Sequence, residues 1–157
     1  MDLLLFTFHL LYIKIILKKE NSDMTKKDKA IELHKKKYNC AQAVACSFSG
    51  EIEVSERLLF KATEAFGRGM GDMQETCGAL SGAVLLAGLK CSDGNTANPG
   101  SKDATYKVSK AMVESFADKT GGTICKELKG IETGKVLCSC PDCIRAGVEV
   151  VEEILKV

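Results

Sequence analysis

The stretch ETCGALSGAVLLAGL, residues 75–89, decides the fold class. It is apolar, spans about four helical turns, and lacks the alternating pattern that marks a half-buried strand. Small residues at a spacing of about one turn leave one helix face without bulk, so another backbone or an inorganic ligand can come close. Tight helix packing alone would use the same pattern. The stretch therefore predicts a buried central helix that contains Cys77 and carries these small residues: Gly78, Ala79, Gly82, Ala83 and Ala87.

Helical patterns continue on both sides of this stretch. Residues 103–122 have apolar side chains along one face, and the last helix is predicted to have Pro141 in its first turn. Asp72 and Glu75 resemble a capping box, which predicts that the central helix runs over 72–90. The expected fold is all-α, a compact single-domain helical bundle around a central helix rich in small residues. Residues 24–157 form that domain.

Residues 1–23 need a separate interpretation. Their apolar run ends in lysines, whereas a signal peptide carries its positive charge first and ends in small residues. Lys19 and Glu20 can be encoded by codons that resemble a bacterial ribosome-binding site. We therefore interpret 1–23 as an over-extended start, with Met24 as the initiator. An N-terminal anchor is the alternative.

Composition excludes several classes of function. The net charge is +1 and aromatic residues make up 6%, which argues against nucleic acid as a partner. Eight cysteines are about 5% of the chain, below the roughly 8–10% of small disulfide scaffolds. The glycine-rich GRGMG at 67–71 follows a predicted helix and lacks a Lys-Ser/Thr ending, so it does not indicate a nucleotide site. Without an export signal, we expect a cytoplasmic domain that does not enter the membrane.

The positions of the cysteines indicate redox or metal chemistry. Cys40 and Cys125 fall at the starts of predicted helices, and Cys140 is predicted to be the N-cap of the last one. The partial positive charge of a helix N-terminus favours a thiolate, the form that attacks disulfides and binds metals. The run CSCPDC adds Cys138 and Cys143, and three close thiols suit a soft metal. Cys46 and Cys91 fit a structural role.

Four stretches together resemble one protein family. In order, YNCAQAV, FGRGMGDMQETCGALSGAVLLAGL, CKELKG and CPDCIRAGVEVVEEIL resemble the C_GCAxxG_C_C family of redox-active bacterial proteins, from about residue 28 to 155. The four cysteines that name the family fall on Cys40, Cys77, Cys125 and Cys140, with Cys143 as a competitor for the fourth position. The resemblance implies redox character without a defined reaction. It also implies a redox partner protein such as an oxidoreductase. A related module occurs in split-Soret-type cytochromes, which makes an iron–sulfur centre a reasonable expectation.

Three functions remain open at this point, and the sequence does not decide whether the chain is an enzyme. The first is electron transfer through an iron–sulfur cluster, which needs four cysteine ligands. Cys40, Cys77, Cys125 and Cys140 or Cys143 would hold it, and Gly78 and Gly82 would make room. The second is a thiol/disulfide oxidoreductase that uses the same thiols and no metal. The third is a structural zinc site in an adaptor. A homodimer that shares the site is compatible with all three.

Overall fold

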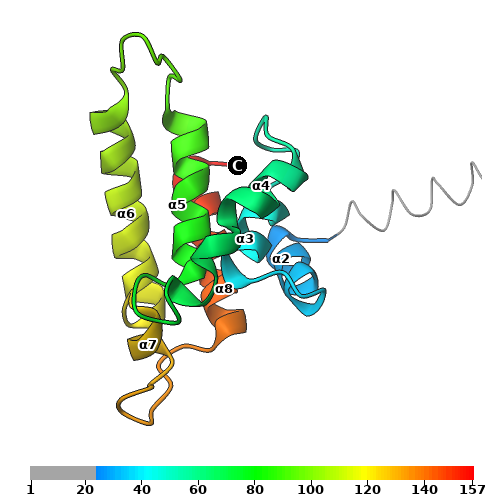
Figure 1. The fold of residues 1–157 in the computed structure, drawn as a ribbon, viewed down its shortest axis with the longest axis vertical. Helices are drawn as coiled ribbons and strands as arrows, with labels where there is room; N and C mark the ends of the chain where they lie inside the picture. The colour runs from blue at the N-terminus through cyan, green and yellow to red at the C-terminus, as the bar shows by residue number, and fades with distance from the viewer. Residues whose placement is uncertain (1–23) are drawn as a thin grey trace, which may run out of the picture.

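The computed structural model describes residues 24–157, and within them the fold is all-α, as predicted (Figure 1). Two isolated backbone bridges form in this part of the chain, but no strand does. The prediction that Met24 is the initiator concerns residues 1–23, which lie outside the described residues. The helical elements are α2 (Lys26–Lys35), α3 (Cys40–Ser47), α4 (Glu56–Thr63), the 3-10 helix η1 (Glu64–Gly69), α5 (Gly78–Cys91), α6 (Lys102–Thr120), α7 (Cys125–Leu128) and α8 (Cys140–Leu155).

The central helix α5 packs against α3, α6 and α8. In Figure 1, α6 runs beside it, α8 lies behind it, and α2, α3 and α4 lie on its other side. Gly82 faces the backbone of Ala41 in α3, and Gly147 of α8 faces the backbone of Ala79. The small residues therefore let two helices approach α5 closely, which is one of the two uses that the sequence pattern suggested.

The start of α5 differs from the prediction. The helix begins at Gly78 with Cys77 as its N-cap, so a helical start at Asp72 was wrong. Arg68, Gly69, Met70, Gly71, Asp72 and Met73 all have positive φ, a conformation that an α-helix cannot contain. Asp72 forms an ion pair with Arg68 at 2.9 Å and is not part of a capping box. The segment is thus a tight turn that precedes the helix.

The helix caps follow local sequence. The side chains of Thr25, Asn39 and Ser55 accept hydrogen bonds from the first turns of α2, α3 and α4. Ser139 is the N-cap of α8 and accepts from the backbone N–H of Asp142. Cys140 is therefore the first residue of α8, and its predicted role as N-cap was wrong. The side chain of serine, with a free hydroxyl oxygen, caps better than a thiol does.

No helix among residues 24–157 has the length and apolar composition that a membrane crossing requires. The buried core of this part of the chain instead consists of apolar side chains at the centre of the bundle. Its largest members are Phe48, Leu59, Leu80, Leu86, Met112, Phe116, Leu128 and Ile144.

Candidate functional site

Five cysteines from four helices form one group, which we call the thiol cluster: Cys40, Cys77, Cys125, Cys140 and Cys143. Each lies at or near a helix N-terminus. Cys40, Cys125 and Cys140 are the first residues of α3, α7 and α8, Cys77 is the N-cap of α5, and Cys143 is in the first turn of α8. The structure thus brings together all the candidate thiols and includes both competitors for the fourth position.

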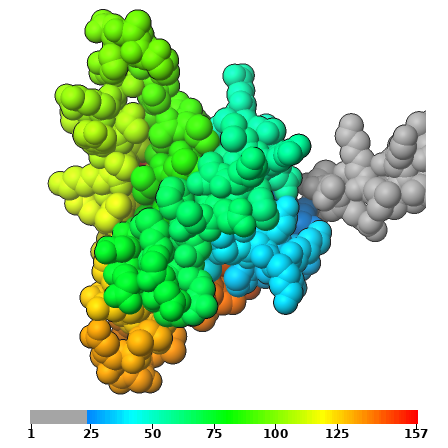
Figure 2. Space-filling view, viewed as in Figure 1, coloured from blue at the N-terminus to red at the C-terminus, as the bar shows by residue number. Residues whose placement is uncertain are grey.

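Two backbone features hold Cys77 and Cys125 in neighbouring segments. The N–H of Cys77 donates to Thr123 O at 2.8 Å, and the N–H of Cys125 donates to Glu75 O at 2.9 Å. A Cβ atom on Gly69, which has φ +61°, would collide with Cys125. The glycine at position 69 is therefore required because its backbone packs directly against the side chain of Cys125. The sequence alone did not reveal this reason. In Figure 2 this green segment is prominent on the lower face, near the orange loop before α8.

Cys40 and Cys140 form the outer pair of the thiol cluster, and both are half-buried. A hydrogen bond between the two sulfurs lowers the pKa of Cys140 to about 5; burial opposes this shift, while Lys129 and His34 support it. The same hydrogen bond raises the pKa of Cys40, and burial adds to that effect. The pair therefore shares one negative charge at neutral pH, carried by Cys140, with Cys40 as the hydrogen-bond donor.

Cys77 and Cys143 form the inner pair, and both are buried. A hydrogen bond with Cys143 raises the pKa of Cys77, and burial and the electrostatic interaction with the Cys143 sulfur add to that effect. Cys125 is buried between the pairs; burial is the largest cause that raises its pKa, and its interactions with the sulfurs of Cys77 and Cys140 add to that effect. The sulfurs thus approach one another in pairs, with the fifth thiol close to both pairs.

Lys129 supplies the positive charge of the thiol cluster, and sequence reasoning missed it. Its Nζ donates to Cys143 Sγ at 3.3 Å and to the carbonyl oxygen of Cys138 at 2.7 Å. Burial lowers the pKa of Lys129, but its interactions with the sulfurs of Cys143 and Cys140 outweigh that effect and raise the pKa overall. Lys129 follows Cys125 by four residues, a spacing that puts both on one helix face. In a chain with so many lysines that spacing is too common to reveal a site.

The remaining cysteines take no part in these pairs. Cys46 is buried in α3, and burial raises its pKa to about 11, with Glu56 and Lys29 as its charged neighbours. Cys91 is the last residue of α5, about 20 Å of helix away from Cys77. Cys138 lies in the buried core and contributes its carbonyl oxygen.

Gly78 and Gly82, which were predicted to make room for a cofactor, both face backbone. A Cβ on Gly78 would lie 2.7 Å from Phe66 O and 3.5 Å from the Cβ of Cys40. A Cβ on Gly82 would lie 2.5 Å from Ala41 O. Both glycines therefore allow the first turn of α3 to approach the first turn of α5, which brings Cys40 towards Cys77.

The donor set of the thiol cluster is entirely sulfur, as iron–sulfur clusters and soft metals require. Within residues 24–157, however, no three Cys, His, Asp or Glu side chains are arranged to hold one metal ion. A cluster with two irons and four cysteine ligands places two thiolates on each iron. The paired sulfurs of the thiol cluster fit this pattern better than they fit a single tetrahedral ion.

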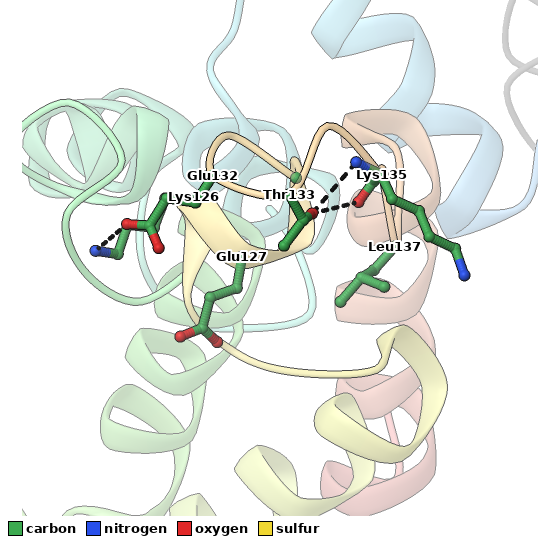
Figure 3. A pocket seen from close by; sticks show the side chains of 7 residues that line it. Lys126, Glu127, Glu132, Thr133, Lys135 and Leu137 are labelled. Atoms are coloured by element: carbon green, nitrogen blue, oxygen red, sulfur yellow. Dashed lines mark hydrogen bonds and ion pairs between the residues drawn. The ribbon is translucent and has the colours of Figure 1, made fainter.

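A separate surface cavity of about 240 Å³ lies at α7 and the loop before α8 (Figure 3). Lys126, Glu127, Glu132, Thr133, Lys135 and Leu137 line it together with Gly130. Lys126 and Glu132 form an ion pair at 3.0 Å, and Thr133 bonds to Lys135. No cysteine belongs to this lining, so the cavity is distinct from the thiol cluster.

An all-α domain with a buried thiol cluster at its helix N-termini defines a class of cysteine-dependent redox protein. The family model described as "Putative redox-active protein (C_GCAxxG_C_C)" matches residues 38–154, so the chain belongs to that family. The resemblance seen in the four sequence stretches is thereby confirmed, as is the coarse expectation of redox character. No curated protein and no solved structure matches the chain.

Proposed function

We propose that the protein transfers electrons through a cysteine-ligated iron–sulfur cluster held by the thiol cluster. The observation that carries this proposal is the convergence of five thiols from four helices, three of them buried. A dithiol enzyme needs two cysteines, whereas an iron–sulfur cluster needs four. The number of sulfurs gathered at one place therefore favours the cluster.

The two thiol pairs supply the four ligands in this proposal. Cys40 and Cys140 are the outer ligands, Cys77 and Cys143 are the inner ones, and Cys125 is the thiol that could replace one of them. When bound, the group would accept and release single electrons. The protein's own contribution is to bury the inner sulfurs, to offset their negative charge with Lys129, and to keep bulk away at Gly69 and Gly82.

A thiol/disulfide oxidoreductase is the second candidate, and a specific observation favours it. Cys140 is half-buried and has its pKa lowered to about 5, as expected of an attacking thiolate. It also begins a C-x-x-C run with Cys143 at the N-terminus of α8. In this reaction the Cys140 thiolate attacks a partner's disulfide, and Cys40 then displaces the partner as a dithiol. Cys40 and Cys140 are left joined by a disulfide.

Structural zinc is the third candidate, and the pairing of the sulfurs favours it least. In each case the partner we propose is a redox protein, and a homodimer that shares the site remains compatible with the half-buried outer pair. We place the protein in the cytoplasm, because reducing compartments keep thiols free.

The visible absorption spectrum of the full chain, purified without oxygen, tests the proposal. Brown protein with iron and sulfide in equal amounts supports the iron–sulfur cluster. Colourless protein without metal contradicts it and favours the dithiol reaction, and colourless protein with stoichiometric zinc favours the third candidate. Cys77→Ser should abolish the colour, whereas Cys91→Ser, at the far end of the same helix, should retain it.

A further inference from the structure

We propose that Lys129 is a positioning residue that sets the reduction potential of the thiol cluster, because it holds a positive charge and a hydrogen-bond donor against the sulfurs. This inference rests on the proposed redox function, since a potential exists only if the thiol cluster is a redox centre. It adds a lysine to a site that the family name describes by four cysteines alone.

The contacts of Lys129 carry the argument. Its Nζ lies 3.3 Å from Cys143 Sγ, and its positive charge also acts on the sulfur of Cys140. Lys129 therefore contacts a sulfur of the inner pair and acts through its charge on a sulfur of the outer pair. Its charge also acts on the other three thiols, Cys40, Cys77 and Cys125. Other charged groups of the described chain reach single members of the cluster, as His34 does for Cys140 and Arg68 for Cys125.

Electron uptake adds negative charge to these sulfurs. An iron–sulfur cluster gains one electron without a change in its ligands. A Cys40–Cys140 disulfide gains two electrons from a reductant such as a dithiol; the S–S bond breaks, and one proton is taken up to leave a thiol and a thiolate. In both cases a nearby cation stabilises the reduced form. Hydrogen bonds to the sulfurs and net charge are among the main determinants of such potentials.

The half-buried position of Lys129 strengthens this effect. A charge beside buried sulfurs is screened less by salt than an exposed one. Within residues 24–157, Lys129 has no carboxylate among its hydrogen-bond partners, which are Cys138 O and Cys143 Sγ. By contrast Lys126, three residues earlier on α7, pairs with Glu132 at 3.0 Å. Lys126 thus offers a matched control with the same charge on the same short helix.

A structural role is the competing explanation. The bond from Lys129 to Cys138 O, at 2.7 Å, ties α7 to the segment that leads into α8. If that were its whole purpose, removal of Lys129 would lower the melting temperature and leave the potential unchanged.

The experiment is a reductive titration of the full chain, with dithionite and mediators if it is brown, or with a dithiol redox buffer and thiol alkylation if it is colourless. Lys129→Met should lower the potential by about 59 mV for one electron or about 30 mV for two, each equal to a tenfold change in the redox equilibrium. Lys129→Arg should retain most of the wild-type potential, and Lys126→Met should not change it. Lys129→Gln keeps a donor without the charge, and provides a second variant if the methionine variant does not fold.

The outcomes separate this inference from the function on which it rests. A reversible couple whose potential is the same in wild type, Lys129→Met and Lys129→Gln would overturn the role of Lys129 alone. A wild-type chain without any reversible couple would overturn the proposed function and this inference with it. A lower potential in Lys129→Met, at a melting temperature matched by Lys126→Met, would support both.

Discussion

Gly82→Ala adds one methyl group at the closest approach of α5 to α3. The new Cβ would lie 2.5 Å from the carbonyl oxygen of Ala41 and 3.0 Å from its Cα. Real Cβ atoms do not approach other atoms so closely, and both neighbours here are backbone. No side-chain rotation can relieve the contact, so α3 has to move away from α5.

Two opposing effects determine how much Gly82→Ala changes the free energy of unfolding. Alanine is favoured over glycine inside a helix by about 1 kcal/mol. Overpacking of a filled core costs about 1–3 kcal/mol. The clash with a backbone carbonyl puts Gly82→Ala near the upper part of that range, so we expect a net loss of about 1–2 kcal/mol. For a chain of this size each kcal/mol lowers the melting temperature by roughly 2–4 °C.

Gly88→Ala is the matched control, because it makes the same chemical change in the same helix. A Cβ at Gly88 would have no atom within 4 Å, so only the helix preference applies. We expect Gly88→Ala to stabilise the protein by about 1 kcal/mol. Thermal unfolding followed by far-ultraviolet circular dichroism should therefore rank the variants as Gly88→Ala, wild type and Gly82→Ala, in descending order of melting temperature.

The same substitution should disturb the thiol cluster. Cys40 directly precedes Ala41, so a displacement of α3 carries Cys40 away from Cys140. We expect less iron per chain in Gly82→Ala than in Gly88→Ala after identical purification. If Gly82→Ala is as stable as Gly88→Ala, the close approach of α3 to α5 is refuted. If it is unstable but keeps its full iron content, the link from this contact to the site is refuted.

Further predictions address the caps and the thiols. Asn39→Ala should lower the free energy of unfolding by about 1 kcal/mol in urea titrations, because the backbone N–H of Gln42 loses its capping bond. Asn98→Ala, in an exposed loop, should not lower it. Cys143→Ser should lose bound iron while Cys91→Ser keeps it, and equal retention would remove Cys143 from the site. In the reduced, metal-free chain iodoacetamide at pH 7 should modify Cys140 before Cys91, and the rate should fall as the pH drops through about 5. The native pKa of Cys140 is below its ordinary value, so between about pH 5 and pH 9 the native chain binds fewer protons than the unfolded chain. The contribution of Cys140 to the free energy of unfolding should therefore decrease as the pH falls from about 9 to about 5.

Helix start residues were predictable where a cap lies in the local sequence. Asn39 followed by Gln42 specifies the start of α3, because both hydrogen bonds of the capping box lie within four residues. The start of α5 was not predictable in this way. Asp72 and Glu75 have the spacing of a capping box, yet the turn at 68–73 adopts positive φ. Its backbone follows contacts with Cys125, which lies about fifty residues further along the chain.

Cys40, Cys125 and Cys140 could be found because helix starts and cysteines are both visible in the sequence, and Cys77 was found through the family resemblance. Which sulfurs pair was not visible. Cys140 and Cys143 are three residues apart, and a local argument would join them to each other. In the structure the thiol of Cys140 is hydrogen-bonded to Cys40 and that of Cys143 to Cys77, because α3 and α5 both approach the first turn of α8.

The sequence by itself determined the all-α class, the small-residue face of α5 and the cysteines at the starts of α3, α7 and α8. These features depend on periodicity and on hydrogen bonds between near neighbours, both of which are local. Only the tertiary structure decided the pairing of the thiols, the place of Cys125 between the pairs and the part played by Lys129. Those depend on how closely segments far apart in sequence can approach. Glycines set that distance here: Gly82 and Gly147 face neighbouring backbone, and Gly69 faces the side chain of Cys125.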